Sequence, residues 1–222
     1  MERIKLALYG GPFDPVHNGH LAVAKAVCEL FALDELWFIP AHIAPHKRAV
    51  PSASPFHRFA MLALATQMEA RLRLSTVELE SPERPYTIDT LTRLRAKYDD
   101  SARLFFVMGA DSWLEIETWR DWQRVLAMVD HIVVARPGYE LRTDHVPAEV
   151  SARIIDLRGK RATEAQRALV ANREKRIFLT DIVQEDLSAT EVRHAVRKAP
   201  ETLDELVPRS VADYIRKHEL YR

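Results

Sequence analysis

This 222-residue chain has only one cysteine and no formal net charge. Its single cysteine, Cys28, excludes an intrachain disulfide and is typical of proteins from reducing compartments. The 32 Lys and Arg residues balance 32 Asp and Glu residues, so the formal net charge is zero. We therefore expect neither a nucleic-acid-binding protein that depends on a strong basic field nor a protein dedicated to anionic membranes.

A long hydrophobic run is also lacking at the N-terminus. Residues 1–5 are charged and precede only a short apolar run, which differs from both a signal peptide and a membrane span. Hydrophobic residues still make up 47% of the chain, which is enough for a sizeable core. The sequence predicts a cytoplasmic globular protein whose single domain covers residues 1–222.

Short apolar runs alternate along the chain with amphipathic stretches. They predict strands at residues 4–9, 36–39, 72–77, 104–108 and 132–135, and helices at 18–31, after Ser54-Pro55, and from Thr87 as cap to about residue 98. A polar region at 140–175, with a weak strand at 154–155 and a helix at 163–171, should be peripheral. Short helices broken by Pro200 and Pro208 should follow Ser188. This order predicts an α/β fold with a parallel sheet and helices on both faces.

In such sheets, ligands bind beyond the carboxyl ends of the strands, where the strand order reverses. The loops after Tyr9, Ile39, Met108 and Thr180 should therefore line one site. Glycine supports this placement because the chain has only 6 glycines. Four of them are expected at this edge of the sheet, namely Gly10, Gly11, Gly19 and Gly109.

The strongest motif is G-G-P-F-D-P-V-H-N-G-H at residues 10–20, between a predicted strand and a predicted helix. Glycines let a ligand approach the backbone, and a helix start offers unpaired N–H groups and a positive dipole end. His17 and His20, three residues apart, can both point at one anion. The motif is neither a Walker A loop nor G-x-G-x-x-G. A tight turn with two surface histidines would explain a lone H-x-x-H, but the full pattern predicts a phosphate site.

A second motif, L-S-A-T-E-V-R, occupies residues 187–193. Ser188 and Glu191 form an S-x-x-E capping box, so a helix should begin here. The simpler interpretation is a cap alone. The functional interpretation adds the Thr190 hydroxyl and the Arg193 guanidinium, whose fork of donors suits a polyphosphate.

Both motifs resemble those of the nucleotidylyltransferase superfamily. The first contains the H-x-G-H signature, and its long form is similar to that of bacterial nicotinate mononucleotide adenylyltransferases. The second is similar to I-S-S-T-x-x-R, with Ala189 where a second serine is common. The resemblance implies a Rossmann-like core over residues 1–186 and C-terminal helices over 187–222. It also implies transfer of AMP from ATP to nicotinate mononucleotide, which gives nicotinate adenine dinucleotide and pyrophosphate in NAD biosynthesis.

Further segments resemble the family's mononucleotide site. Lys47 stands in the P-H-K-R loop where the family places a basic residue for the mononucleotide phosphate, and Thr87 lies in a segment similar to Y-T-x-x-T. Asp111 belongs to a G-x-D-S match and would contact sugar hydroxyls. Trp119 belongs to a T-W match and would stack on the pyridine ring, and Arg120 would place a cation near the nicotinate carboxylate.

The resemblance implies direct in-line attack by the mononucleotide phosphate on the ATP α-phosphorus, without a covalent intermediate. Mg²⁺ would be bound through the ATP phosphates rather than by a protein metal site. The implied catalytic residues are His17, His20 and Arg193. The implied ATP-binding residues are Gly10, Gly11, Phe13, His17, Gly19, His20, Gly109, Asp111, Ser188, Thr190 and Arg193.

Three other functions compete with this one. A pantetheine-phosphate adenylyltransferase usually has Thr for the first His of the signature, so His17, Lys47 and Trp119 argue against it. A metal-dependent hydrolase is suggested by five histidines in the first quarter, but no carboxylate stands at a recognised ligand spacing. A nucleotide sensor without activity conflicts with two intact phosphate motifs. The expected partners are ATP and nicotinate mononucleotide, with no nucleic acid and no membrane, for a monomer or homodimer.

Overall fold

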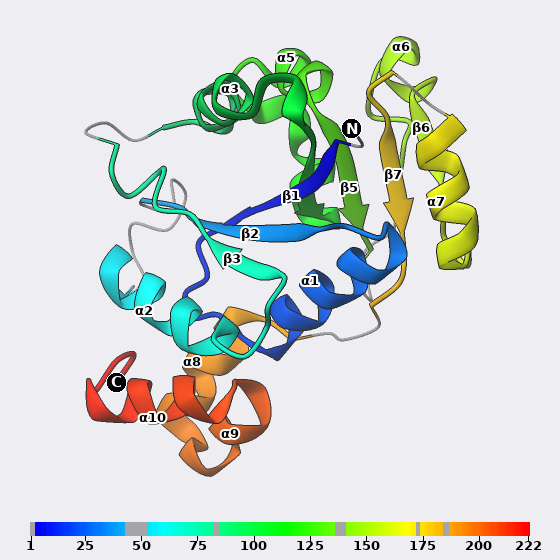
Figure 1. Cartoon of the computed structure of the whole chain (residues 1–222). Coiled ribbons are helices and arrows are strands. Elements are labelled where there is room, and N and C mark those ends of the chain that lie inside the picture. The colour runs from blue at the N-terminus through cyan, green and yellow to red at the C-terminus, as the bar shows by residue number, and fades with distance from the viewer. Residues whose placement is uncertain (1–2, 43–52, 82–84, 136–140, 172–173, 184–186) are drawn as a thin grey trace.

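A computed structural model of the chain describes residues 3–42, 53–81, 85–135, 141–171, 174–183 and 187–222 (Figure 1). Its centre is a sheet of seven parallel strands in the order β3-β2-β1-β4-β5-β7-β6. The strands are β1 Ile4–Gly11, β2 Glu35–Pro40, β3 Leu72–Leu74, β4 Ala102–Gly109, β5 Asp130–Val134, β6 Ile154–Asp156 and β7 Ile177–Thr180.

Helices separate most of the strands, as parallel crossovers require. They are α1 Asn18–Leu30, α2 Pro55–Thr66, α3 Thr87–Tyr98, α4 Ala110–Leu114, α5 Trp122–Met128, α6 Ala148–Ser151, α7 Ala162–Ala171, α8 Ala189–Lys198, α9 Leu203–Leu206 and α10 Arg209–Lys217. The α/β fold class predicted from the sequence is confirmed. In the described part of the chain, no helix combines the length and hydropathy needed to cross a membrane.

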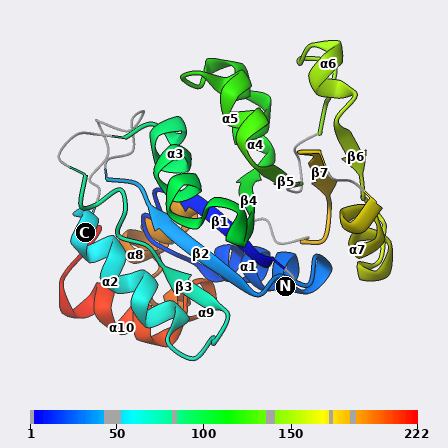
Figure 2. The same ribbon diagram turned by 45° about the horizontal axis from the view of Figure 1, so that its top comes forward.

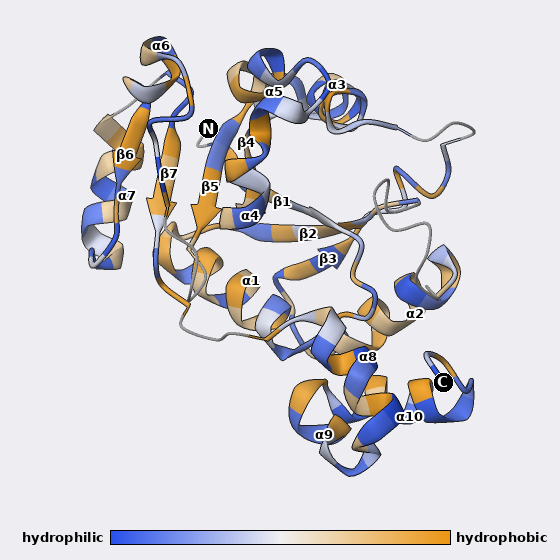
Figure 3. Cartoon of the chain, turned by 180° about the vertical axis from the view of Figure 1, so that it is seen from behind, coloured by the Kyte–Doolittle hydropathy of each residue, from blue (hydrophilic) through white to orange (hydrophobic). Residues whose placement is uncertain are grey.

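The central strands bury alternate residues in two apolar layers. Ala7 and Phe105 pack in the layer of α1, α2 and the C-terminal helices, whereas Leu8 and Phe106 pack in the layer of α3, α4 and α5. Figures 1 and 2 show these two groups of helices on opposite faces of the sheet. The strands β5 and β7 are largely hydrophobic (Figure 3) and fully buried, as expected for a sheet covered on both sides.

Cys28 lies on the inward face of α1. It is buried, and burial raises the pKa of its thiol to about 11. It therefore acts as a small apolar side chain of the core and stays a thiol at neutral pH.

Most predicted elements are present, with two corrections. The strand predicted at 72–77 ends at Leu74, because the chain turns at Ser75, whose Oγ accepts a hydrogen bond from the N–H of Val77 at 3.3 Å. The cap of α3 is Tyr86 rather than Thr87, which is the first residue of the helix. The N–H of Tyr86 donates to Oδ2 of Asp89 at 3.0 Å, and this bond fixes the start of α3 one residue earlier than predicted.

The predicted strand and helix within residues 140–175 are present as β6 and α7, and β6 forms one edge of the sheet. This confirms a peripheral position for that strand. The C-terminal helices follow Ser188 and are interrupted at Pro200 and Pro208, as the sequence predicted. They pack beside α2 (Figure 1), and the Ser210 hydroxyl of α10 donates to the Leu64 carbonyl at 3.2 Å.

Candidate functional site

The strand order reverses between β1 and β4. From β1 the chain moves outward through β2 to β3, and from β4 it moves the other way to β5, β7 and β6. The carboxyl ends of β1 and β4 therefore form the switch point, where parallel sheets bind ligands. Gly10 and Gly11 end β1, and Gly109 ends β4, so three of the four glycines predicted for this edge lie there.

His17 and His20 meet at the start of α1. Their ring centroids are 3.7 Å apart, and His17 is 5% exposed at the N-cap position. Gly19 leaves room for this arrangement, because a Cβ there would lie 3.2 Å from Nδ1 of His17. The first turn of α1 carries no acidic side chain, so the positive end of its dipole is not offset by a carboxylate within that turn. The two predicted histidines thus share one location at a helix N-terminus suited to an anion.

The hydrogen bonding of His20 fixes its tautomer. Its Nδ1 accepts a hydrogen bond from the backbone N–H of His17 at 3.3 Å. In the neutral ring, the hydrogen is therefore on Nε2. The imidazole edge that carries Nε2 is a donor, which is what stabilising charge on a phosphate oxygen requires.

Phe13 supports this pair of histidines from the loop between β1 and α1. It is buried, and its ring meets His20 edge to face with centroids 5.0 Å apart. It also contacts Tyr9 and Phe38 at 5.5 and 5.3 Å. Its φ of 45° is unusual for a residue with a side chain, so the packing of the ring compensates a strained backbone. The role of Phe13 is to fix the ring of His20 and the path of the loop.

The second motif lies where α8 begins. Ser188 and Glu191 form the predicted capping box, with Ser188 N–H donating to Oε2 of Glu191 at 2.7 Å and Glu191 N–H donating to Oγ of Ser188 at 3.2 Å. Arg193 is buried and donates to the Asp14 carbonyl at 2.6 Å and to Oγ1 of Thr190 at 3.0 Å. Arg193 therefore joins the second motif directly to the first, across 179 residues of sequence.

The predicted mononucleotide residues gather around the start of α3. The guanidinium of Arg120 lies 4.8 Å from the ring centre of Tyr86, the residue before Thr87. Trp119 meets Phe106 edge to face at 6.1 Å, and Phe106 is also the ring nearest to a Cβ placed on Gly10. Aromatic contacts thus connect this group to the end of β1.

Asp111 lies at the start of α4, directly after β4. Its carboxylate is exposed and folds back over Gly109, where an added Cβ would lie 2.7 Å from Oδ1. Only glycine at position 109 leaves the carboxylate in this place. Lys47 falls outside the described residues.

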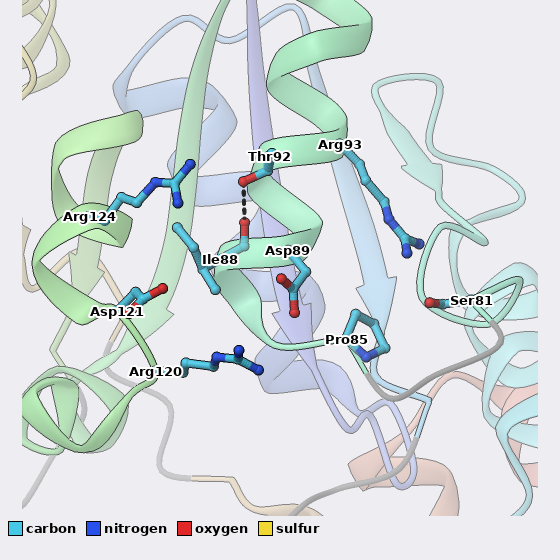
Figure 4. A pocket seen from close by; sticks show the side chains of 9 residues that line it. All are labelled: Ser81, Pro85, Ile88, Asp89, Thr92, Arg93, Arg120, Asp121 and Arg124. Atoms are coloured by element: carbon cyan, nitrogen blue, oxygen red, sulfur yellow. Dashed lines mark hydrogen bonds between the residues drawn. The ribbon is translucent and has the colours of Figure 1, made fainter.

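A groove of about 560 Å³, open to solvent, lies at the start of α3 and is lined in part by Arg120. Figure 4 shows it between the first turns of α3 and the segment that leads into α5. Its lining includes Arg93, Arg120 and Arg124 together with Asp89 and Asp121, so it is strongly polar. Of the predicted site residues, Arg120 lines this groove. The lining does not include His17 or His20.

Arg58 was missed by the sequence analysis. It is 3% exposed, and its guanidinium donates to four backbone carbonyls: Pro12, Ala41 at 2.5 Å, His42 at 3.1 Å and Ala53 at 3.3 Å. Burial lowers the pKa of Arg58, and the nearby Asp14 carboxylate partly offsets that effect. An arginine at helical spacing from Met61 and Leu62, on the apolar face of α2, was the available signal.

Glu78 was missed as well. One of its carboxylate oxygens accepts from the Thr90 hydroxyl at 2.8 Å, and the backbone of His42 also donates to the carboxylate. Burial raises the pKa of Glu78 to about 7. Nothing in its polar sequence context indicates this burial.

The chain is similar in sequence to known proteins over nearly its whole length. The model of the family described as cytidylyltransferase-like matches residues 8–195. A probable nicotinate-nucleotide adenylyltransferase of Solibacter usitatus is 37% identical over 98% of this chain and 100% of its own length. A protein of the same name from Desulfatibacillum aliphaticivorans is 35% identical, again over 98% of this chain and 100% of its own length.

Solved structures give the same fold. The nicotinic acid mononucleotide adenylyltransferase of Plasmodium falciparum, complexed with NaAD, aligns with a TM-score of 0.73 over 99% of this chain and 98% of its own. The sequence identity of that pair is 18%, so the likeness concerns the fold alone. Together with the relatives of full length, these findings identify the chain as a member of the cytidylyltransferase-like family, within its nicotinate-nucleotide adenylyltransferases.

Proposed function

We propose that this protein transfers AMP from ATP to nicotinate mononucleotide and releases pyrophosphate by direct in-line attack. The observation that carries the proposal is the pair of histidines at the N-terminus of α1, placed at the switch point of the sheet. The attacking phosphate is already an anion, so the reaction needs no strong general base. Catalysis then consists of positioning the two substrates and stabilising the charge that develops on the transferred phosphate.

Each residue at the phosphate end has a role that follows from its place. Nε2 of His20 donates to an oxygen of the α-phosphate, and His17 faces the same phosphates from the N-cap of α1. Arg193 uses one hydrogen on each terminal nitrogen for Asp14 and Thr190, and its remaining hydrogens are donors for the outer phosphates. Gly10, Gly11 and Gly19 keep the backbone accessible, and Ser188 begins the helix that holds Thr190 and Arg193.

ATP enters as its Mg²⁺ complex, as part of the substrate. Among the described residues, no group of three His, Cys, Asp or Glu side chains is arranged to hold a metal ion. The ion would be held by the phosphate oxygens of ATP, because Mg²⁺ usually keeps several waters and is bound through substrate phosphates. Its charge offsets that of the triphosphate, while the protein contributes the donors named above.

The mononucleotide end lies between α3 and Trp119. The first N–H groups of α3, beginning at Thr87, are donors for the nicotinate carboxylate, and Arg120 adds a positive charge beside them. The first turn of α3 also carries Asp89, whose carboxylate accepts from the N–H of Tyr86, and the charge of Arg120 offsets it. Trp119 offers its ring to the pyridine, and Asp111 offers its exposed carboxylate to sugar hydroxyls. Lys47 is assigned to the mononucleotide phosphate on the sequence motif.

The test is pyrophosphate release from Mg-ATP with nicotinate mononucleotide, nicotinamide mononucleotide or phosphopantetheine as acceptor. We expect turnover with the nicotinate form and little with the others. Arg120→Gln should lower kcat/KM for the nicotinate form by about ten-fold, since a charge-assisted contact is lost, and leave the nicotinamide form unchanged.

Arg124→Gln is the matched control, because Arg124 is a second arginine that lines the same groove (Figure 4), whereas Arg120 is the one that lies over the ring of Tyr86, next to Thr87. Equal effects of the two substitutions would refute the role of Arg120. Absence of pyrophosphate with every acceptor would refute the proposed function itself.

A further inference from the structure

The loop that carries the two histidines is held from the far end of the sequence. Tyr221 follows α10, and its hydroxyl donates to Oδ1 of Asp14 at 2.8 Å, across 207 residues of sequence. Asp14 belongs to the motif at residues 10–20 and stands three residues before His17. The contact is buried, since Tyr221 is 6% exposed and Asp14 is 9% exposed. The C-terminal segment therefore reaches the loop at residues 10–20 that leads to the two histidines.

Tyr221 is itself fixed in place. Its carbonyl accepts from Nε of Arg197 in α8 at 2.8 Å. The chain turns back after α10 through Leu220, whose N–H donates to the Ile215 carbonyl at 3.1 Å. Glu219 and Tyr221 both adopt left-handed backbone conformations in this turn, with φ of 53° and 67°. The turn is what directs the phenol ring inward.

Asp14 collects contacts from three elements. Besides Tyr221, its Oδ1 accepts from the N–H of Ala53, before α2, at 3.1 Å. Its backbone carbonyl accepts from Arg193 of α8. A carboxylate that accepts two hydrogen bonds and lies near buried arginines is confined to one position. The residues on either side, Phe13 and the segment up to His17, are then confined with it.

Electrostatics keep the hydroxyl of Tyr221 in the donor state. Burial raises the pKa of this hydroxyl, and the negative charge of Asp14 raises it further. The positive charges of Arg58 and Arg193 act in the opposite direction but do not reverse the shift. The hydrogen therefore stays on the phenol, and Asp14 stays the acceptor.

We propose that Tyr221 is a positioning residue for ATP, which acts by fixing Asp14 and thereby the loop that presents His17 and His20. The inference rests on the proposed function, because it concerns the same ATP site. It gives the C-terminal segment a part in ATP binding, since the hydroxyl of Tyr221, after α10, holds Asp14 in the loop at residues 10–20.

The test compares Tyr221→Phe with Tyr214→Phe. Tyr214 of α10 makes a similar hydroxyl contact, but 2.9 Å from Nδ1 of His57 in α2, whereas Tyr221 contacts Asp14 in the loop at residues 10–20. The dissociation constant of Mg-ATP is measured by calorimetry without an acceptor, and the melting temperature of each variant is recorded. We expect Tyr221→Phe to weaken ATP binding about ten-fold, as loss of a hydrogen bond to a charged group does, and Tyr214→Phe to leave it unchanged.

The steady-state KM for the mononucleotide should not change in either variant. A purely structural role predicts a lower melting temperature with unchanged ATP affinity, and that result for Tyr221→Phe would overturn the inference. If wild-type protein binds no ATP, the proposed function fails instead, so the two failures are distinguishable.

A double-mutant cycle with Asp14→Ala gives a second readout. Asp14→Ala should weaken ATP binding as Tyr221→Phe does, and the double variant should be no weaker than Asp14→Ala alone, because both remove one coupled contact. Additive effects would show that Tyr221 does not act through Asp14. Asp14→Asn keeps an acceptor oxygen and should retain most of the affinity.

Discussion

Glu78 makes the stability of this protein depend on pH near neutrality. Its carboxylate lies in the turn between β3 and α3 and accepts from Thr90 and from the backbone of His42. Burial raises its pKa from an ordinary value of 4.5 to about 7, although the two hydrogen bonds and the charge of Arg58 lower it. Burial is the larger effect, so the folded protein favours the neutral carboxyl group.

The magnitude follows from the two pKa values. The folded state binds the proton more tightly than the unfolded chain, so this group favours folding most below pH 4.5 and loses that contribution as the pH rises through 7. The pKa values differ by about 2.5 pH units. At about 1.4 kcal/mol per unit, ionisation of Glu78 lowers the free energy of unfolding by about 3 kcal/mol at pH 8.

Glu78→Gln removes this dependence, because an amide is neutral at every pH and its oxygen can still accept from Thr90 and His42. We expect the variant to be more stable than the wild type by about 3 kcal/mol at pH 8 and of equal stability at pH 4.5. The assay is urea unfolding at intervals between these pH values, with the difference in unfolding free energy plotted against pH.

Glu80→Gln is the control. Glu80 lies in the same turn and accepts from the Thr76 hydroxyl at 2.7 Å, but it is exposed. Glu80→Gln retains Glu78, so its unfolding free energy should keep the pH dependence that Glu78 gives the wild type. A difference for Glu78→Gln that is constant with pH, or that favours the wild type at pH 8, would refute the reasoning.

Three further predictions concern the site and the core. His20→Ala should lower kcat by about 10²–10³ while weakening ATP binding less, since a donor to the transferred phosphate is lost, and near-normal turnover would contradict that role. Gly109→Ala should displace the carboxylate of Asp111. Steady-state kinetics should then show a larger rise in KM for the mononucleotide than for ATP. Asp130→Ala should lower the unfolding free energy by about 3 kcal/mol in urea, because Asp130 is fully buried with the Arg103 side chain and the Arg176 N–H as donors. The control is Asp156→Ala, which removes the exposed ion pair between Asp156 and Arg158. It should lower the unfolding free energy by less than about 1 kcal/mol.

Local patterns in the sequence predicted much of the fold and both motifs of the candidate phosphate site. Apolar runs and helical periodicity indicated β1, α1, β4 and α7, because these patterns express which face of an element is buried. The capping box at Ser188 and the glycine-histidine motif were readable for a similar reason. Their geometry depends on residues a few positions apart, and the backbone itself brings those residues together.

The contacts that complete the site were decided by the tertiary structure. Arg58 binds carbonyls from three separate segments, and Tyr221 meets Asp14 across the whole length of the chain. No periodicity encodes such pairs, because they depend on which elements the sheet order and the C-terminal helices bring side by side. The burial of Glu78, and with it the raised pKa, arises in the same way. The sequence by itself determined an α/β fold and predicted a phosphate site at residues 10–20, and packing at long range determined how the loop at these residues is held.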